Sequence, residues 1–433
     1  MGIAHYREIV LALKGNGATR AHMKALREND NSKNQIYLGK GFAALQLLPF
    51  GKIVNCSTEK QVIEKAPVNF SWMTDSWTTE PAPNTKLILY PQYPEVRLSG
   101  FLSGCACAPS EHMQAVPGDQ RTGTDGRYLI LGVTPLGHII GYLVLPDSAV
   151  AASIVDDFPD LHIKKGVLVD LPFESGNPRR ELLDRLVAVA KAGWIPSQRL
   201  NSEGTIVEYR ARNAGGYVLE AQFGIIPNGL AEPDFQGWEL KSFSGNVLTL
   251  MTPEPDSGFY FEQGAEAFVR RFGHDAGNDV IYFTGCHKAD SKNATTGLTL
   301  TAIGYAAERG KFIDLDGGLA LKTDDGEVAA LWTFRRLIRH WARKHARAAY
   351  LRNEKQEVAG KVGYSFLGPA WLGEGTSFEN FMTAFLSGYI YLDPASKVSD
   401  ASTDHSKVKA RSQFRIKAAN LGALYHAFTE EPL

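Results

Sequence analysis

The sequence has few cysteines, no long apolar run and almost no net charge, and each of these absences argues against a class of protein. Its 4 cysteines are irregularly spaced, which argues against the disulfide framework of a small secreted domain. No segment approaches the roughly 18 consecutive apolar residues of a membrane-spanning helix. The first residues, MGIAHYREIVLALKGNG, lack the basic start and apolar stretch of a secretory signal. We therefore expect a soluble protein of the reducing cytoplasm, with no membrane partner.

Length and composition are those of ordinary globular proteins. A formal net charge of -1 points to no particular partner, so any basic surface must be local. The 433 residues, 44% of them hydrophobic, suffice for two domains with apolar cores. Cys105 and Cys107 could begin a metal site, but no second Cys or His pair stands at ligand spacing. Two buried thiols are the preferred interpretation of this pair.

The first third of the chain is predicted to be β-rich. After a short helix over 4–14, runs rich in β-branched, aromatic and aliphatic residues indicate strands. The segment TPLG at 134–137 is typical of a hairpin turn. Several short strands within about 150 residues predict a barrel or a sandwich. The runs are NQIYLG, KLILYPQYPEVRLSGFL, RYLILGV and HIIGYLVL.

The pattern changes near residue 170, where we place a domain boundary. Pro178 follows Ser175, Gly176 and Asn177 and begins a predicted helix, whose apolar stripe comprises Leu182, Leu183, Leu186 and Val187. Further helices are expected over 215–225, with one inward carboxylate, Glu220, and over 328–351. Strands are expected at FQGWELKSFS, VLTLMT and DVIYFTG, and GYIYLDP and SQFRIKAA follow near the C-terminus. Residues 171–433 therefore predict an α/β domain with a mixed sheet flanked by helices.

One expected strand carries charges that a buried strand rarely keeps. In AEPDFQGWELKSFSG, residues 231–245, Glu239 and Lys241 project to the same face because strand side chains alternate. Trp238 and Leu240 project to the other face, into the packing. Asp234 follows Pro233, where the chain can turn its carboxylate toward Glu239. The pattern predicts two carboxylates and an ammonium group around one point.

Such a trio has a definite chemistry. Two converging carboxylates repel each other unless a cation lies between them, and Mg²⁺ prefers oxygen ligands while keeping several waters. Lys241 could orient a water molecule or neutralise charge on a phosphate, so the trio suits hydrolysis of a phosphodiester. The alternative is a surface strand with a salt bridge, because Asp-x4-Glu-x-Lys alone is a weak pattern. The large apolar residues around it favour the metal site.

The segment PDFQGWELKS resembles the PD-(D/E)xK nuclease signature, in the form of the MvaI/BcnI family of type II restriction endonucleases and the related nickase MutH. The likeness extends from about residue 175 to the end and is specific over 215–243. It implies that Asp234 and Glu239 bind Mg²⁺ and that Lys241 positions the attacking water. It also implies that Glu220 matches the family's helix carboxylate. Family members often act as monomers on double-stranded DNA, and a cognate DNA methyltransferase can accompany them.

The N-terminal third has a fainter likeness. KALRENDNSKNQIYLGKGFAALQLLPFG, residues 24–51, is similar in layout to the start of the EcoRII N-terminal effector domain, a DNA-binding pseudobarrel. It implies that residues 1–170 form a β-rich, pseudobarrel-like DNA-binding domain. The alternative for RENDNSKN is a polar loop between two elements.

Two basic segments are candidates for DNA contact. Residues 331–361 contain nine Lys or Arg against Glu354 and Glu357, and a helix there would align four arginines on one stripe, with Leu331, Phe334, Ile338 and Trp341 packed beneath. A solvated face is the alternative, but in a candidate nuclease the stripe is expected to follow phosphates. Base reading needs forked donors, and Arg415 is the best candidate in STDHSKVKARSQFRIK. The predicted DNA-binding residues are Arg335, Arg339, Arg343, Arg347, His405, Lys407, Arg411 and Arg415.

The sequence thus predicts a Mg²⁺-dependent type II restriction endonuclease. A MutH-like nicking or modification-dependent endonuclease is the first alternative. A DNA-binding protein with an inactive nuclease fold is the second, and the complete set of Asp234, Glu239 and Lys241 argues against it.

Overall fold

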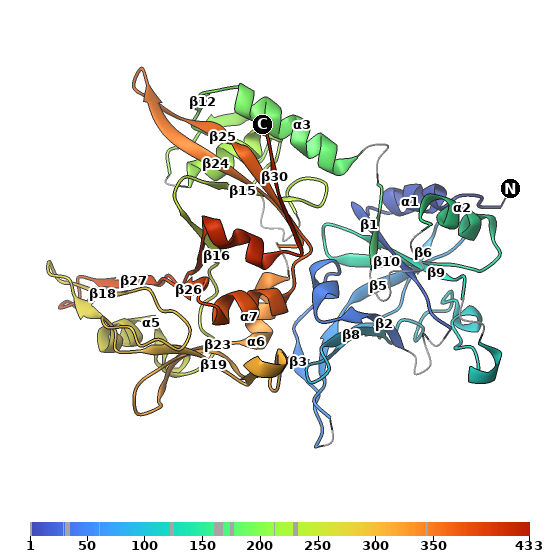
Figure 1. Ribbon diagram of the computed structural model, residues 1–433, viewed down its shortest axis with the longest axis horizontal. Coiled ribbons are helices and arrows are strands. Elements are labelled where there is room, and N and C mark those ends of the chain that lie inside the picture. The colour runs from blue at the N-terminus through green and yellow to red at the C-terminus, as the bar shows by residue number, and fades with distance from the viewer. Residues whose placement is uncertain are drawn as a thin grey trace.

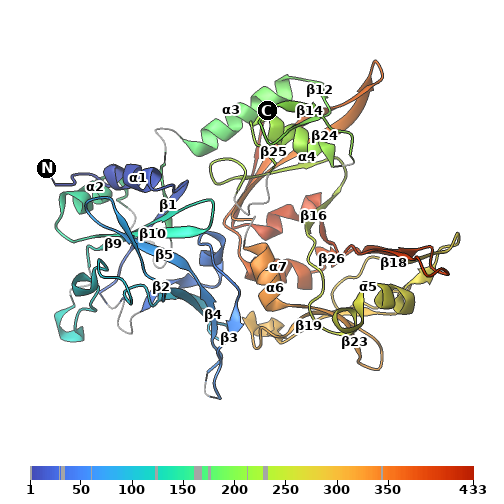
Figure 2. The same ribbon diagram turned by 180° about the vertical axis from the view of Figure 1, so that it is seen from behind.

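The computed structural model describes residues 2–28, 30, 35–59, 61–121, 125–159, 168–173, 177–211, 213–227, 233–342 and 345–433. Figure 1 shows an N-terminal unit, coloured blue to teal, beside a larger C-terminal unit with an upper and a lower lobe. Figure 2 shows the same arrangement from behind. No helix within the described ranges is long and apolar enough to cross a membrane.

The N-terminal unit is β-rich, as predicted. Its two sheets have the strand orders β11-β1-β9-β10-β5-β6 and β2-β8-β7-β4-β3. The TPLG segment joins β9 to β10 as expected, because the Gly137 amide donates to the Thr134 carbonyl at 3.0 Å. The elements are α1 (Tyr6–Gly15), β1 (Arg20–Ala25), β2 (Gln35–Lys40), β3 (Val54–Asn55), β4 (Glu64–Pro67), β5 (Asn69–Met73), β6 (Thr79–Pro81), β7 (Lys86–Tyr90), β8 (Glu95–Ser99), β9 (Tyr128–Val133), β10 (His138–Val144), α2 (Ala149–Asp157) and β11 (Val169–Leu171).

The chain passes from the N-terminal unit to the C-terminal unit between β11 and α3 (Pro178–Lys191). The strand β11 still pairs with β1 of the first sheet, and α3 begins the second unit. The Asn177 side chain caps this helix by accepting from the Arg179 and Arg180 amides, and Pro178 fills its first turn. Ser175 and Gly176, and residues 29 and 31–34 of the polar segment at 27–34, lie outside the described residues.

The upper lobe holds a mixed sheet. Its order is β12-β25-β24-β15, with β30 also paired to β25. The strand β15 (Glu239–Phe243) runs parallel to β24, whereas the other pairs are antiparallel. An apolar core joins this sheet to α3 and α4. The remaining elements are β12 (Ile195–Pro196), β13 (Gln198–Leu200), β14 (Ile206–Glu208), α4 (Ala214–Gln222), β24 (Arg347–Val358), β25 (Lys361–Glu374) and β30 (Ala427–Glu431).

The lower lobe consists of small antiparallel sheets around α5, α6 and α7 (Figure 1). Its sheets have the orders β16-β29-β26, β17-β18-β27-β28, β19-β22-β23 and β20-β21. The elements are β16 (Val247–Met251), α5 (Phe259–Phe272), β17 (His274–Asp275), β18 (Val280–Thr284), β19 (Thr299–Ile303), β20 (Tyr305–Ala306), β21 (Lys311–Phe312), β22 (Gly318–Lys322), β23 (Val328–Thr333), α6 (Phe334–Trp341), α7 (Phe378–Leu386), β26 (Ile390–Leu392), β27 (Ala395–Ser399), β28 (Lys407–Lys409) and β29 (Phe414–Lys417).

The prediction of one long helix over 328–351 is wrong. The first part of that segment is the strand β23, the middle is the short helix α6, and the last part lies in β24. Thr333 separates strand from helix, because its hydroxyl accepts from the Arg336 amide at 3.3 Å. A buried strand with both faces covered is apolar throughout, so periodicity alone does not distinguish it from a buried helix.

The two units share one apolar core. A single cluster of buried side chains includes residues of both sheets of the N-terminal unit and of all three helices of the lower lobe. At the junction, the ring of Phe42 stacks on Phe312 with centroids 5.5 Å apart, and Phe312 stacks on Phe378 at 5.7 Å. An interface of this kind fixes the two units relative to each other.

Candidate active site

The charged strand is built as its pattern predicted. Trp238 and Leu240 are buried in the core of the upper lobe, at 1% and 6% exposure. Glu239 and Lys241 lie on the opposite face, where the Lys241 Nζ is 3.1 Å from the Glu239 Oε1. Alternation along β15 therefore separates the packing residues from the charged ones.

A tight turn brings Asp234 to the strand. Phe235 and Trp238 exchange both backbone hydrogen bonds, at 2.9 and 2.8 Å, and the intervening Gln236 and Gly237 have φ of 43° and 86°. Two successive positive φ values match the left-handed turns that close hairpins, and glycine adopts them at little cost. The Asp234 Oδ2 then accepts from the Leu240 amide at 2.8 Å. The turn thus folds this carboxylate back beside Glu239.

The third predicted carboxylate comes from α4, which packs against the upper sheet through Val218 and Leu219. Glu220, Asp234 and Glu239 line one cavity of about 460 Å³. The structure therefore brings together all four residues proposed for catalysis, since Lys241 contacts Glu239 directly.

The polar atoms of this cavity are suited to a divalent cation. The Glu239 Oε2 is buried and has no hydrogen-bond partner among the described residues. A buried oxygen without a partner costs about 1–3 kcal/mol, which a cation bound there would offset. The Asp234 carboxylate adds an oxygen ligand to the same cavity. Mg²⁺ is commonly held by one or two carboxylates together with substrate phosphate, so the residues present fit this ion.

A tighter group of ligand atoms occurs elsewhere, in the N-terminal unit. Within the described ranges, the group of three with all ligand atoms inside 4.8 Å is Glu80, Cys105 and Cys107, and the catalytic carboxylates form no such group. The Glu80 oxygens accept from the amides of Ala106 at 2.7 Å and Cys107 at 3.1 Å. Burial, with the adjacent Cys105 thiol, raises the pKa of Cys107 to about 12. Both thiols are half-buried, whereas buried thiols were expected.

The predicted arginine stripe does not exist, because its residues lie on different elements. Arg335 is on α6 and pairs with Glu64 of β4 through two hydrogen bonds, at 2.7 and 2.8 Å. Arg347 belongs to β24 and pairs with Asp170. Arg339 is exposed on α6, and Arg343 lies outside the described residues. Two of the four arginines therefore join the N-terminal unit to the C-terminal one.

The second basic segment lies on the lower lobe. His405 and Arg411 are exposed, and Lys407 of β28 pairs with Asp400 at 3.3 Å. Arg415 lies within β29, where its Nη1 is 2.5 Å from the Asp393 Oδ2. Its side chain is 29% exposed, so part of the guanidinium faces solvent.

The residues that the N-terminal unit adds to the site were not predicted from the sequence. Thr19, Arg20 and Pro135 line the same cavity as the three carboxylates. They precede Glu239 by at least 104 residues (239 − 135) and belong to no motif that points to it. Only the packing of the two units against each other places them there.

Comparison with known proteins identifies the C-terminal unit. A solved complex of restriction endonuclease MvaI with cognate DNA is similar to 59% of this chain and 99% of its own, at 16% identity and a TM-score of 0.44. MvaI in the absence of DNA matches at 14% identity and a TM-score of 0.33, over 59% of this chain and 98% of its own. No curated protein matches the chain. The sequence model of the MvaI/BcnI restriction endonuclease family matches residues 183–425.

That match covers more than half of the 433 residues and includes Glu220, β15 and Arg415. The C-terminal region therefore has a restriction-endonuclease-like fold with a mixed sheet. Because the match spans both lobes of the C-terminal unit, the chain belongs to the MvaI/BcnI restriction endonuclease family and is a type II site-specific endonuclease.

Proposed function

We propose that the protein hydrolyses double-stranded DNA at the cavity lined by Glu220, Asp234 and Glu239, with Mg²⁺ as its metal. The observation that supports this most is the buried Glu239 Oε2, which lies beside the Lys241 ammonium group and has no hydrogen-bond partner in the described part of the chain. A structural salt bridge on a surface strand would leave no carboxylate oxygen buried without a partner.

Each residue has a distinct part in this proposal. Asp234 and Glu239 hold the cation, which when bound supplies Lewis acidity toward a phosphodiester and lowers the pKa of water. Lys241 orients the attacking water and offsets negative charge on the phosphate, and the Glu239 carboxylate fixes its ammonium group in place. The water oxygen forms a bond to phosphorus and releases a proton to solvent, the opposite P–O bond breaks, and the leaving oxygen takes up a proton from solvent. Glu220 adds negative potential that draws the cation into the cavity.

We propose that DNA contacts come from both basic regions. Arg339 is exposed on α6 and is suited to a phosphate, whereas Arg335 and Arg347 are engaged in ion pairs that connect the two units. On the lower lobe, His405, Lys407 and Arg411 would contact the backbone and Arg415 a base edge. We further propose a pseudobarrel-like, DNA-binding N-terminal unit and a monomeric enzyme. A cognate DNA methyltransferase would protect the host's own sites.

The test is cleavage of unmethylated phage DNA with Mg²⁺, with mapping of the ends. We expect Asp234→Ala to lose at least about a thousandfold in rate, since a metal ligand supports several kcal/mol and 1.36 kcal/mol is tenfold. Its affinity for DNA should remain close to that of the wild type, because it loses no cation that contacts phosphate.

Asp184→Ala is the matched control, because Asp184 is an exposed carboxylate on α3 that does not line the cavity. It should cleave like the wild type. Mg²⁺-dependent cutting by a clean preparation of Asp234→Ala would refute the assignment of the site.

A further inference from the structure

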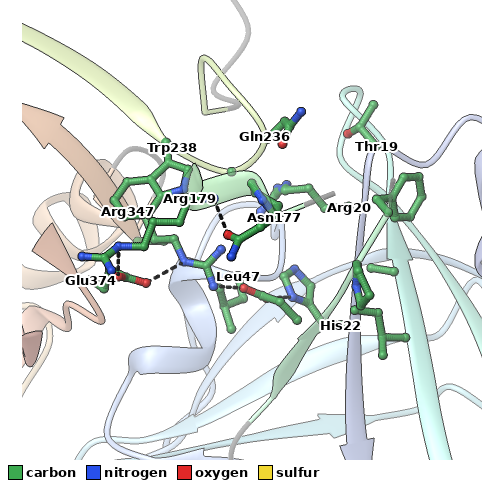
Figure 3. A pocket seen from close by; sticks show the side chains of 18 of the residues that line it. Thr19, Arg20, His22, Leu47, Asn177, Arg179, Gln236, Trp238, Arg347 and Glu374 are labelled. Atoms are coloured by element: carbon green, nitrogen blue, oxygen red, sulfur yellow. Dashed lines mark hydrogen bonds and ion pairs between the residues drawn. The ribbon is translucent and has the colours of Figure 1, made fainter. Parts of the chain in front are cut away.

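Three cavities meet between the N-terminal unit and the C-terminal unit. The first, of about 350 Å³, lies between β1 and β24, and Figure 3 shows Arg20, His22, Trp238 and Arg347 around it. The second, of about 650 Å³, lies beside α6, and the third is the catalytic cavity. Arg20 lines all three. This arginine therefore stands where the spaces between the units converge.

The second cavity differs from the other two in its charge. Its lining residues include Arg20, Arg339, His345 and Arg347, and no aspartate or glutamate among the described residues. The first cavity balances its cations with Asp170, Glu181 and Glu374. Although Arg347 pairs with Asp170, this lining holds arginines and no acid among the described residues, so the second cavity is more positive than the first and suits a chain of phosphates.

The electropositive cavity leads to the carboxylates. Arg20, Pro135 and Pro233 line both the second cavity and the catalytic one, and Pro233 immediately precedes Asp234. A DNA strand that follows the arginines of the second cavity therefore arrives at the metal ligands. There it meets three carboxylates, whose charge repels phosphate, and a guanidinium on the same wall reduces that repulsion.

We propose that Arg20 binds a backbone phosphate of the strand to be cleaved, so that the N-terminal unit forms one wall of the catalytic cleft. The inference rests on the proposed function, because it assigns the carboxylates to DNA cleavage. The strand β1 pairs with β9, whose Leu129, Leu131 and Val133 belong to the apolar core that the two units share, so Arg20 is pre-positioned before DNA arrives. The neighbouring turn at 134–137, with Pro135 on the cavity wall, would lie along the same strand.

The test measures binding separately from cleavage. Arg20→Ala and the longer neutral variant Arg20→Gln are made in the Asp234→Ala background and titrated without metal against a random-sequence duplex, with fluorescence anisotropy as the readout. Backbone contacts do not depend on sequence, so this probe needs no knowledge of the recognition site. Between about 50 mM and 200 mM salt, each lost phosphate contact should reduce the slope of log K against log salt by about 0.9.

Arg20→Lys should restore most of the slope, and Arg7→Ala is the control. Arg7 belongs to the same unit, but is 65% exposed and pairs with Asp157 on α2. In the Asp234-intact protein, Arg20→Ala and Arg20→Gln should also cleave more slowly. Unchanged affinity and slope in both variants would overturn the proposal. Faster cleavage with unchanged binding would also overturn the proposal, because the N-terminal unit would then obstruct the catalytic cavity instead of binding DNA beside it.

The outcomes also separate this inference from the proposed function. If the wild type binds duplex DNA through Arg20 but never cleaves it, the phosphate contact of Arg20 is supported and the assignment of the carboxylates to DNA cleavage is wrong. If the wild type cleaves DNA and the Arg20 variants bind and cleave like it, the assignment of the carboxylates is supported and the proposed role of Arg20 in the cleft wall is wrong.

Discussion

We expect removal of the Arg335 side chain to lower the free energy of unfolding of the protein without lowering its affinity for DNA. Its guanidinium forms two hydrogen bonds to Glu64, at 2.7 and 2.8 Å, and also pairs with Asp316. Glu64 is completely buried, at 0% exposure, and lies on a strand of the other unit. In Arg335→Ala that carboxylate would remain buried without its arginine partner.

The expected cost follows from this burial. Breaking a buried ion pair by removing one member destabilises by about 3–5 kcal/mol, because an uncompensated charge stays in a low-dielectric site. Replacing both members with apolar residues of similar size, as in Glu64→Leu with Arg335→Met, removes that charge. We therefore expect the double variant to recover most of the stability that the single variant loses.

The assay is urea denaturation followed by tryptophan fluorescence, with DNA affinity measured on the same preparations. Arg339→Ala is the matched control, since Arg339 is an exposed arginine one turn further along α6. It should change stability by less than about 0.5 kcal/mol and should weaken DNA binding. If Arg335→Ala is instead as stable as the wild type and binds DNA less tightly, Arg335 is a phosphate contact and our account of it is wrong.

Two further predictions concern the lower lobe. Burial lowers the pKa of His287 from its ordinary 6.5 to about 4, with its Nδ1 donating to the Gly285 carbonyl and its Nε2 accepting from Thr296. Between these two pKa values, the His287 imidazole binds a proton in the unfolded chain but not in the folded one. The free energy of unfolding should therefore fall by about 3 kcal/mol as the pH drops from 6.5 to 4. Urea denaturation across that pH range should show a smaller loss of stability for His287→Gln than for the wild type. Equal losses in the two proteins would refute the assignment of this pH dependence to His287. Arg415→Ala should cost roughly 1–3 kcal/mol of binding on the cognate duplex and little on a scrambled one, by parallel titration. Equal losses on the two duplexes would make Arg415 a phosphate contact.

The sequence predicted the charged strand well because its geometry is local. Alternation fixes the sides of Glu239 and Lys241, and a four-residue turn fixes Asp234, so no distant residue is needed. The helix carboxylate Glu220 was proposed from the resemblance, which supplied its spacing, and it lines the same cavity as Asp234 and Glu239.

The basic segment was mispredicted for two reasons. Residues 328–333 form a strand because they pair with the nearby strand β22, but an apolar run of this length is equally compatible with a buried helix. The role of Arg335 depends on Glu64, which lies 271 positions earlier and outside any window around α6. The contribution of Arg20 to the catalytic cavity escaped prediction for the same reason.

The stacked rings of Phe42, Phe312 and Phe378 also bear on how such enzymes can be recombined. A chimera that exchanges the N-terminal unit at the connection near residue 172 would place a foreign surface against α6 and α7. It would also separate Glu64 of the N-terminal unit from Arg335 of the C-terminal unit, so that each loses its ion-pair partner. Grafting onto this endonuclease must therefore carry the facing side chains of both units together.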